Sequence, residues 1–317
     1  VRYQRICRPA IREQIYLMEN VLTLIGSRNW APLASDVVSM AVGALEEAGA
    51  ECSAPDWLSD EHACDIHYEG FSPSVGEASV RQYLRDMPID MVSQKSEFRR
   101  KRLLLSDMDS TIIQQECIDE VAAYAGLRDQ VSEITEAAMR GELDFSASLI
   151  RRAAMLKDID VEVLQKVYQD RITLTPGART LVQTMRNNGA WSKLVSGGFT
   201  YFTNLVSIQT GFHDHQANRL EVIAGRLTGG VIPPILDNHA KRSALFKCVE
   251  ALGLKPEETM AVGDGANDIP MLQEAGLGVA FHAKPLVAAS SNARLDHADL
   301  TGALYAQGYR DEEFVTD

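Results

Sequence analysis

The feature that most constrains the fold of this chain is a pattern in which short apolar runs alternate with longer segments of helical periodicity. Residues 103–106, 191–195 and 259–262 are largely apolar and too short for helices, which favours buried strands of a parallel sheet. Residues 118–170 carry apolar side chains at three-to-four spacing and predict helices, with breaks at Gly126 and Gly141. Strands that alternate with helices predict an α/β fold with a doubly wound, Rossmann-like parallel sheet.

The same alternation continues toward the C-terminus. Residues 239–252 are typical of a helix, and residues 278–281 predict a further short strand. Residues 218–231 predict a hairpin that turns at Ala224 and Gly225. The second half of the chain therefore extends the predicted sheet.

Composition and charge exclude several classes of protein. The formal net charge of −13 and a single basic run, residues 99–102, argue against a nucleic-acid partner. No window reaches the ~18 uncharged apolar residues that a membrane span requires. Five scattered cysteines without a C-x-x-C pair argue against a disulfide framework or a zinc site and favour a reducing cytoplasm. An acidic protein that binds phosphate needs a cation or a local basic cluster to hold it.

Polar residues follow each of the three predicted strands. Ligands of parallel sheets bind beyond the carboxyl ends of the strands, so we expect these loops to meet at one site. Oxygen ligands without His or Cys select Mg²⁺ over zinc, and glycine lets the backbone approach a phosphate closely. Lys241, near the start of a predicted helix, offers a positive charge. The candidates from the three loops are Asp107, Asp109, Ser196, Gly197, Asp264 and Asp268.

Each of these signals has a plainer explanation when taken alone. Asp-x-Asp after a strand is commonly a turn or a helix cap, and Ser-Gly-Gly is a common loop. Gly-Asp-Gly-x-Asn-Asp alone could belong to a calcium loop. Their occurrence together, each directly after a predicted strand, favours a functional site over coincidence.

With these residues in place, the chain resembles the haloacid dehalogenase superfamily and, within it, the phosphoserine phosphatases. The resemblance runs from about Leu103 to Tyr309, around two-thirds of the chain. It extends to stretches outside the strand-end loops, namely residues 116–120, 139–141, 145, 148–149 and 156–158.

The resemblance implies a two-step hydrolysis. Asp107 would be the nucleophile that forms an aspartyl phosphate, which water cleaves more easily than an alkyl ester. Asp109 would protonate the leaving serine oxygen and then act as the base that activates water.

The resemblance also implies a metal site and a phosphate site. Mg²⁺ would be held by the Asp107 carboxylate, the Asp109 carbonyl and Asp264, and would neutralise charge on the phosphoryl group. The remaining assignments are Asp268 behind the metal ligands, Asn267 as a substrate contact, and Ser196, Gly197 and Lys241 as ligands of the phosphoryl oxygens.

Substrate choice is expected to depend on Glu116 and Arg152. In phosphoserine phosphatases a Glu after the first loop contacts the substrate ammonium, and an Arg of the cap binds its carboxylate; these two residues occupy the matching positions. Carboxylate and guanidinium suit the two charges of an amino acid. Adjacent arginines on a helix commonly face solvent, but the alignment of Phe145 and Ser148 favours Arg152 over Arg151.

The resemblance therefore implies a cytoplasmic, Mg²⁺-dependent phosphatase. It would hydrolyse O-phospho-L-serine to L-serine and phosphate, the last step of the phosphorylated route of serine biosynthesis. The same core would also serve a phosphotransferase or a phosphatase for another small ester. A binding protein on a decayed core is disfavoured because every expected catalytic residue is present. The oligomeric state stays open, a homodimer included.

Domain boundaries follow from a change of composition near residue 95. Residues 1–18, up to the first Met, are expected to be an N-terminal extension that need not be native. Residues 19–97 are expected to form a small α+β domain, which would be ACT-like because some phosphoserine phosphatases carry amino-acid-binding ACT domains at this end. Residues 98–317 are expected to form the haloacid dehalogenase-like domain, with a helical cap at about residues 113–172.

Overall fold

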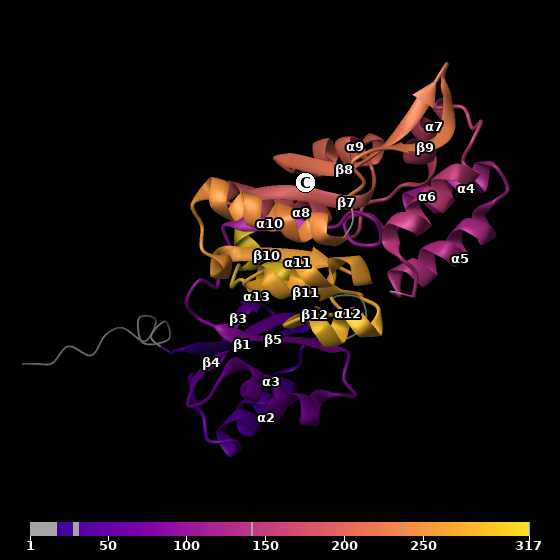
Figure 1. Ribbon diagram of the computed structural model, residues 1–317. Coiled ribbons are helices and arrows are strands. Elements are labelled where there is room, and N and C mark those ends of the chain that lie inside the picture. Colours follow the sequence, from indigo (N-terminus) through magenta and orange to yellow (C-terminus); the bar gives the residue numbers. More distant parts are fainter. Residues whose placement is uncertain (1–17, 28–31, 141, 237, 317) are drawn as a thin grey trace, which may run out of the picture. The chain divides into compact units, whose positions relative to one another are not determined.

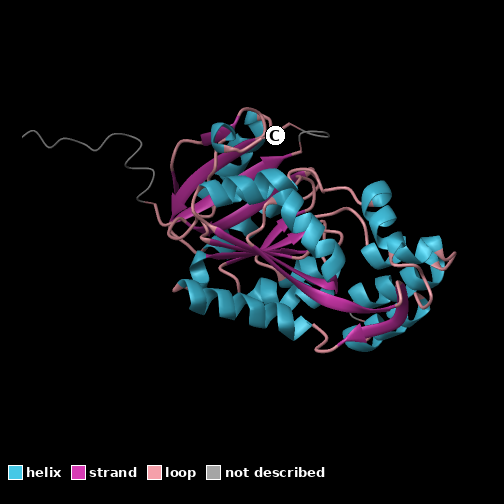
Figure 2. Ribbon diagram, turned by 90° about the horizontal axis from the view of Figure 1, so that it is seen from above, coloured by secondary structure: helices cyan, strands magenta, loops and turns pink. Residues whose placement is uncertain are grey.

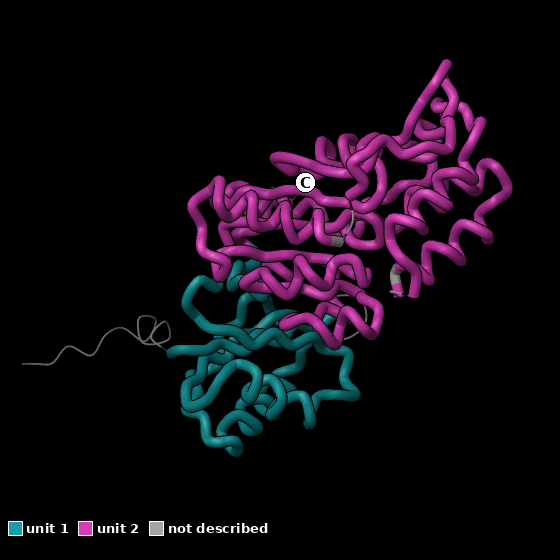
Figure 3. Tube along the Cα trace, in the orientation of Figure 1, with its two compact units in different colours: residues 1–99, 305–311 teal, residues 100–304, 312–317 magenta. Residues whose placement is uncertain are grey.

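The computed structural model describes residues 18–27, 32–140, 142–236 and 238–316. The expected extension therefore lies, except for Met18, outside the described residues. The chain divides into two compact units, the smaller of residues 1–99 with 305–311 and the larger of residues 100–304 with 312–317 (Figure 3).

The smaller unit is an antiparallel sheet with two helices on one face. The sheet has the order β2-β4-β1-β5, with β3 beside β4, and the chain follows a β-α-β-β-α-β path with β3 as an extra strand. Leu22 and Leu24 of β1 pack in one core with both helices, because alternate residues of a strand share a face. The elements are β1 (Asn20–Gly26), α2 (Ser35–Glu47), β2 (Glu51–Cys52), β3 (Asp56–Ser59), β4 (Ala63–Glu69), α3 (Pro73–Leu84) and β5 (Ile89–Lys95).

Residues 305–311 return to the smaller unit, which no sequence pattern indicated. The Arg99 guanidinium donates to both Asp65 oxygens at 2.6 Å and also to the carbonyls of Tyr305 (3.2 Å) and Ala306 (3.0 Å). Arg99 therefore joins this late segment to the buried face of β4. The ACT-like relationship of residues 19–97 stays a prediction.

The larger unit contains a seven-stranded sheet in the order β12-β11-β10-β6-β7-β8-β9. All neighbouring pairs are parallel except β8 and β9, which confirms the predicted α/β fold. Helices cover both faces (Figure 2), which explains why Leu103, Leu104 and Leu105 are all fully buried. The strands are β6 (Leu103–Ser106), β7 (Trp191–Phe199), β8 (Asp214–Ile223), β9 (Arg226–Ile232), β10 (Thr259–Gly263), β11 (Leu277–Phe281) and β12 (Ala293–Leu295). The helices beside the sheet are α8 (Ala178–Asn187), α9 (Thr200–Thr210), α10 (Asn238–Leu252), α11 (Ile269–Glu274) and α12 (Pro285–Ser290), and the short helix α13 (Gly302–Ala306) follows β12.

Four helices follow β6 within residues 113–172, the region expected to form the cap, and they are called the cap below. They are α4 (Cys117–Tyr124), α5 (Arg128–Met139), α6 (Phe145–Met155) and α7 (Glu162–Arg171). Gly126 lies between α4 and α5 at a φ of 70°, where glycine is favoured. The other predicted break, Gly141, lies outside the described residues.

The β8–β9 hairpin extends from the sheet to the cap (Figure 1). Ala224 and Gly225 form its turn as predicted, both with positive φ. Leu227 of β9 exchanges backbone hydrogen bonds of 2.9 Å with Asp158 and Ile159 of the α6–α7 loop. The cap is therefore attached to the sheet by hydrogen bonds as well as by the chain itself.

One predicted loop is part of a strand. We expected Ser196, Gly197 and Gly198 to form a loop after a strand that ends at Val195, but β7 continues to Phe199. The pairing with β8 shifts register between Val195 and Phe199, so the strand bends where these small residues lie.

Candidate active site

The carboxyl ends of β6 and β10 bring three carboxylates together. Asp107 directly follows β6, and Asp264 directly follows the neighbouring strand β10. Asp268 ends the 3₁₀ turn Ala266–Asp268. One oxygen of each lies within 4.8 Å of the others, and all three residues are buried.

Lys241 of α10 is the cation of this cluster. Its Nζ lies 2.8 Å from Asp107 Oδ1 and 2.6 Å from Asp268 Oδ1. Burial alone would lower the pKa of Lys241, but the charges and hydrogen bonds of these two carboxylates raise it above its ordinary value. Lys241 is therefore held as an ammonium beside the candidate nucleophile.

One ammonium does not balance three buried carboxylates. Burial, and then the charges of Asp268 and Asp264, raise the pKa of Asp107 well above its ordinary range. Burial and the charge of Asp268 raise the pKa of Asp264 to about 7. A hard divalent cation fits this all-oxygen set, because it would supply the missing positive charge. The candidate metal ligands are thus Asp107 and Asp264, and Asp268 lies beside them with its oxygens accepting from Lys241 at 2.6 Å and from the Gly265 N–H at 3.1 Å; a contribution from the Asp109 carbonyl stays a prediction.

The two oxygens of Asp107 have different surroundings. Oδ1 accepts hydrogen bonds from Lys241 Nζ and from the Met108 N–H, each at 2.8 Å. No hydrogen bond from the described residues reaches Oδ2, and Asp107 lines a small cavity. Oδ2 is therefore the oxygen open to a substrate.

Asp109 is oriented by donors from two elements. Its Oδ1 accepts from the backbone N–H of Cys117 at 2.8 Å, at the start of α4. Its Oδ2 accepts from the Ser196 hydroxyl at 3.0 Å, and the Gly198 N–H donates to that hydroxyl at 2.8 Å. The carboxylate thus faces the Ser-Gly-Gly segment.

Glu116 and Arg152 reach the same cavity as the two aspartates. The Ser110 hydroxyl donates to Glu116 Oε1 at 2.7 Å, and Ser110 has a φ of 55°, so the chain reverses between Asp109 and Glu116. Arg152 is only 3% exposed, and its Nη2 has no partner among the described residues. Arg152 therefore keeps an unpaired guanidinium nitrogen among the described residues and lines the same cavity as the Glu116 carboxylate.

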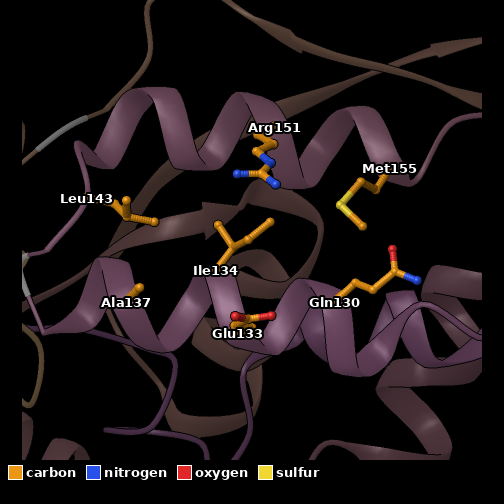
Figure 4. A pocket seen from close by; sticks show the side chains of 7 residues that line it. All are labelled: Gln130, Glu133, Ile134, Ala137, Leu143, Arg151 and Met155. Atoms are coloured by element: carbon orange, nitrogen blue, oxygen red, sulfur yellow. The ribbon is translucent and has the colours of Figure 1, made fainter.

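Arg151 lies elsewhere, in a pocket between α5 and α6. Figure 4 shows its side chain extending from α6 toward α5, beside Ile134 and Met155. This pocket of about 300 Å³ contains none of the residues predicted for the active site. One residue along a helix turns a side chain by about 100°, which separates Arg151 from Arg152.

The cavity at the aspartates is almost filled. Its volume is about 20 Å³, close to that of one water position. A Cβ on Gly197 would lie 2.3 Å from Cζ of Phe145, so only glycine fits beneath this ring. We therefore expect Phe145 and its part of the cap to move when a phosphate ester enters. The lining residues are Asp107, Asp109, Glu116, Ile118, Phe145, Leu149, Arg152, Gly197, Gly198, Phe199 and Asn267.

Asn267 also faces this cavity. Its Oδ1 is buried and lacks a hydrogen-bond partner among the described residues. An unpaired buried acceptor favours a ligand with a donor at this position.

Three residues that support the site were not predicted from the sequence. The Thr111 hydroxyl donates to Asp264 Oδ1 at 2.9 Å, and the Cys117 N–H orients Asp109. Asn218 Nδ2 donates to the Gly197 carbonyl at 2.8 Å, while its Oδ1 accepts from the Leu236 N–H. A buried Asn inside a strand is uncommon, so Asn218 was the one of the three with a detectable signal.

The titration of Glu116 predicts how the stability of the metal-free protein depends on pH. Burial, then the charges of Asp109 and Asp264, raise the pKa of Glu116 from 4.5 to about 8. Between these values the unfolded chain has released a proton that the folded chain retains, so stability falls as the pH rises through that window. We expect the melting temperature in chelator to fall from about pH 5 to about pH 8. Glu116→Gln is expected to reduce the fall of the melting temperature with pH. An unchanged fall in this variant would contradict the assignment of this pH dependence to Glu116.

Within the described ranges, no helix has the length and apolar character needed to cross a bilayer.

Comparisons with known proteins identify relatives of the larger unit. A family described as haloacid dehalogenase-like hydrolase matches residues 101–276, which include every site residue predicted above. The chain is 46% identical over 215 residues to a phosphoserine phosphatase of Streptomyces coelicolor, covering 68% of this chain and 52% of that protein. It is 42% identical over 231 residues to a phosphoserine phosphatase of Archaeoglobus fulgidus, covering 71% of this chain and 67% of that one. The match thus spans only about half the length of the Streptomyces relative.

A solved structure shows the same similarity in three dimensions. A phospho-aspartyl intermediate analogue of phosphoserine phosphatase is 41% identical to this chain, with a TM-score of 0.62. The match covers 65% of this chain and 98% of that one.

Proposed function

This chain belongs to the haloacid dehalogenase-like hydrolases, and from that membership we propose that it hydrolyses O-phospho-L-serine to L-serine and inorganic phosphate. The observation that carries the proposal is the pair of opposite charges, Glu116 and Arg152, in the cavity of Asp107 and Asp109. The relatives named above, which are phosphoserine phosphatases, support the same substrate.

Glu116 and Arg152 suit the two charges of the serine moiety. The Glu116 carboxylate binds the substrate ammonium, whose positive charge would offset the burial and the charges of Asp109 and Asp264 that raise the pKa of Glu116. The free Nη2 edge of Arg152 binds the α-carboxylate. An ester that lacks the ammonium loses the contact with Glu116, and an ester that lacks the carboxylate loses the contact with Arg152.

The first step forms a phosphoaspartate. Asp107 Oδ2 attacks phosphorus, the bond from phosphorus to the serine oxygen breaks, and Asp109 gives its proton to that oxygen. Lys241 holds Asp107 through Oδ1, so the attacking oxygen stays free. Ser196 and the Gly197 backbone bind the phosphoryl oxygens together with the Lys241 ammonium.

The second step releases phosphate. Asp109, now a carboxylate, takes a proton from a water that attacks the phosphoaspartate, and the bond between phosphorus and Asp107 breaks. Asp107 regains its carboxylate and Asp109 its proton, so the residues return to their starting states.

Asp107 and Asp264 would hold Mg²⁺ in this site, together with the Asp109 carbonyl, and Asp268 would lie behind them. When bound, the ion supplies positive charge that lets an anionic nucleophile meet an anionic phosphoryl group. The four cysteines of the described residues are free, which suits a reducing cytoplasm. A product L-serine would make the reaction the last step of serine biosynthesis.

A substrate series tests this function. O-Phosphoethanolamine lacks the carboxylate of phosphoserine, and 3-phosphooxypropanoate lacks its ammonium. We expect release of phosphate from O-phospho-L-serine, lost in chelator and restored by Mg²⁺, with kcat/KM roughly 10-fold or more above that for either analogue. Arg152→Lys should remove the preference for O-phospho-L-serine over O-phosphoethanolamine and leave the other preference unchanged. Glu116→Gln should remove the preference for O-phospho-L-serine over 3-phosphooxypropanoate and leave the first unchanged. Equal rates on all three esters would instead favour a phosphatase of broader specificity.

A further inference from the structure

We propose that Thr135 and Asp119 are positioning residues that hold the Arg152 guanidinium in place for the substrate carboxylate. The inference rests on the proposed function, because it concerns how the enzyme distinguishes an amino-acid ester from other small esters. Neither residue lines the active-site cavity. Their effect on a substrate therefore passes through Arg152.

The three side chains form a continuous chain of hydrogen bonds inside the cap. Arg152 Nη1 on α6 donates to Thr135 Oγ1 on α5 at 3.0 Å. Thr135 Oγ1 donates to Asp119 Oδ1 on α4 at 2.7 Å, and the Ser132 hydroxyl donates to Asp119 Oδ2 at 2.7 Å. Three helices of the cap are thus linked through the Thr135 hydroxyl.

These groups are buried, so their geometry is restricted. The exposed fractions are 2% for Thr135, 3% for Arg152 and 7% for Asp119. The remaining contact of the guanidinium is Nε to the Ser148 carbonyl at 3.3 Å. Nε and Nη1 are therefore held by the protein, while Nη2 has no partner among the described residues.

The Thr135 hydroxyl separates two charges that could otherwise pair directly. Elsewhere in the chain, Arg99 and Asp65 form a direct pair in which Nη1 and Nη2 each contact a carboxylate oxygen at 2.6 Å. Such a pair occupies the outer edge of the guanidinium. With a hydroxyl between Asp119 and Arg152, the charges still compensate, and one edge stays available to a ligand.

The side chain at position 135 must accept a hydrogen bond from Arg152 and donate one to Asp119, and the threonine hydroxyl does both. Thr135 Oγ1 accepts from Arg152 with a lone pair and carries a single hydrogen. It has two acceptors within reach, Asp119 at 2.7 Å and the Val131 carbonyl at 3.0 Å, and the carboxylate is both closer and charged. A valine side chain has the same shape but neither donates nor accepts a hydrogen bond, whereas a serine hydroxyl does both.

The test compares two buried helical threonines. Thr135→Val removes the connecting hydroxyl and Thr135→Ser keeps it. Thr210→Val is the matched control, because Thr210 is fully buried on α9 and donates to the carbonyl four residues earlier, as Thr135 can. Each variant is assayed with O-phospho-L-serine and O-phosphoethanolamine in Mg²⁺, and its melting temperature is measured.

The expected result is a loss of substrate preference in one variant. Thr135→Val should lower kcat/KM for O-phospho-L-serine roughly 10-fold or more, mainly through KM, because a hydrogen bond to a charged group is lost. Its kcat/KM for O-phosphoethanolamine should stay within about twofold, since that ester has no carboxylate for Arg152. Thr135→Ser and Thr210→Val should keep the wild-type preference, and Asp119→Asn should lose it.

Two results would overturn the inference, and they are distinguishable. If the wild-type enzyme prefers O-phospho-L-serine and Thr135→Val retains that preference, Thr135 does not position Arg152. A fall of equal size for both esters in Thr135→Val also contradicts the inference, because it indicates a general disturbance of the cap. If the wild-type enzyme shows no preference for O-phospho-L-serine, the proposed function itself fails, and this inference with it.

Discussion

Replacing Asp107 with Asn is expected to lower turnover of O-phospho-L-serine by at least about 10⁴-fold, because an amide oxygen is a poor nucleophile and cannot form the phosphoaspartate. The protein should remain folded. Burial and the charges of Asp268 and Asp264 raise the pKa of Asp107, so the surroundings disfavour its charge. Removal of that charge should leave the free energy of unfolding unchanged or higher.

Steady-state phosphate release and urea unfolding, measured on the same preparations, check this prediction. Asp214→Asn is a suitable control, because Asp214 is half exposed and lies in a surface ion pair with Lys193. That variant should keep its activity. An Asp107→Asn enzyme with more than about 1% of wild-type turnover would contradict the nucleophile assignment.

The second large effect is expected for Lys241→Met. Lys241 is 2% exposed and contacts Asp107 and Asp268 at 2.8 and 2.6 Å. Without it, the buried carboxylates face one another with no compensating cation. We expect the metal-free variant to lose about 3–5 kcal/mol of unfolding free energy at neutral pH, the usual cost of removing one partner of a buried ion pair.

The control for Lys241→Met is a lysine whose carboxylate partner is half exposed. Lys193→Met removes a contact of 2.8 Å to Asp214 and should cost about 1 kcal/mol or less. Urea unfolding in chelator measures both variants. Because protonation relieves carboxylate repulsion, the cost of Lys241→Met should shrink as the pH is lowered. A cost no larger than that of Lys193→Met would show that Lys241 does not neutralise the cluster.

The sheet and the catalytic loops could be predicted from the sequence because both depend on local pattern. The strand at residues 103–106 has the predicted bounds, since a strand covered on both faces leaves an uninterrupted apolar run. Asp107 and Asp264 follow strands that are neighbours in the sheet. Their convergence therefore follows from the topology of a parallel sheet.

Features that depend on distant residues could not be predicted in this way. Thr135 meets Arg152 only because α5 packs against α6, and nothing in the local sequence around residue 135 indicates that contact. The return of residues 305–311 to the smaller unit depends on Arg99, about 200 positions earlier in the chain. The choice of Arg152 over Arg151 came from the family resemblance, and the structure gives its physical basis in the direction of each side chain.

The phosphoaspartate is the central claim, and trapping it is the most direct test. The enzyme is mixed with radiolabelled O-phospho-L-serine and Mg²⁺, quenched in acid within milliseconds, digested, and mapped. We predict a label on the peptide that contains Asp107, removed by hydroxylamine as for an acyl phosphate and absent from Asp107→Asn. Release of phosphate with no labelled protein at any time, or a hydroxylamine-resistant label on neighbouring Ser110, would contradict the mechanism.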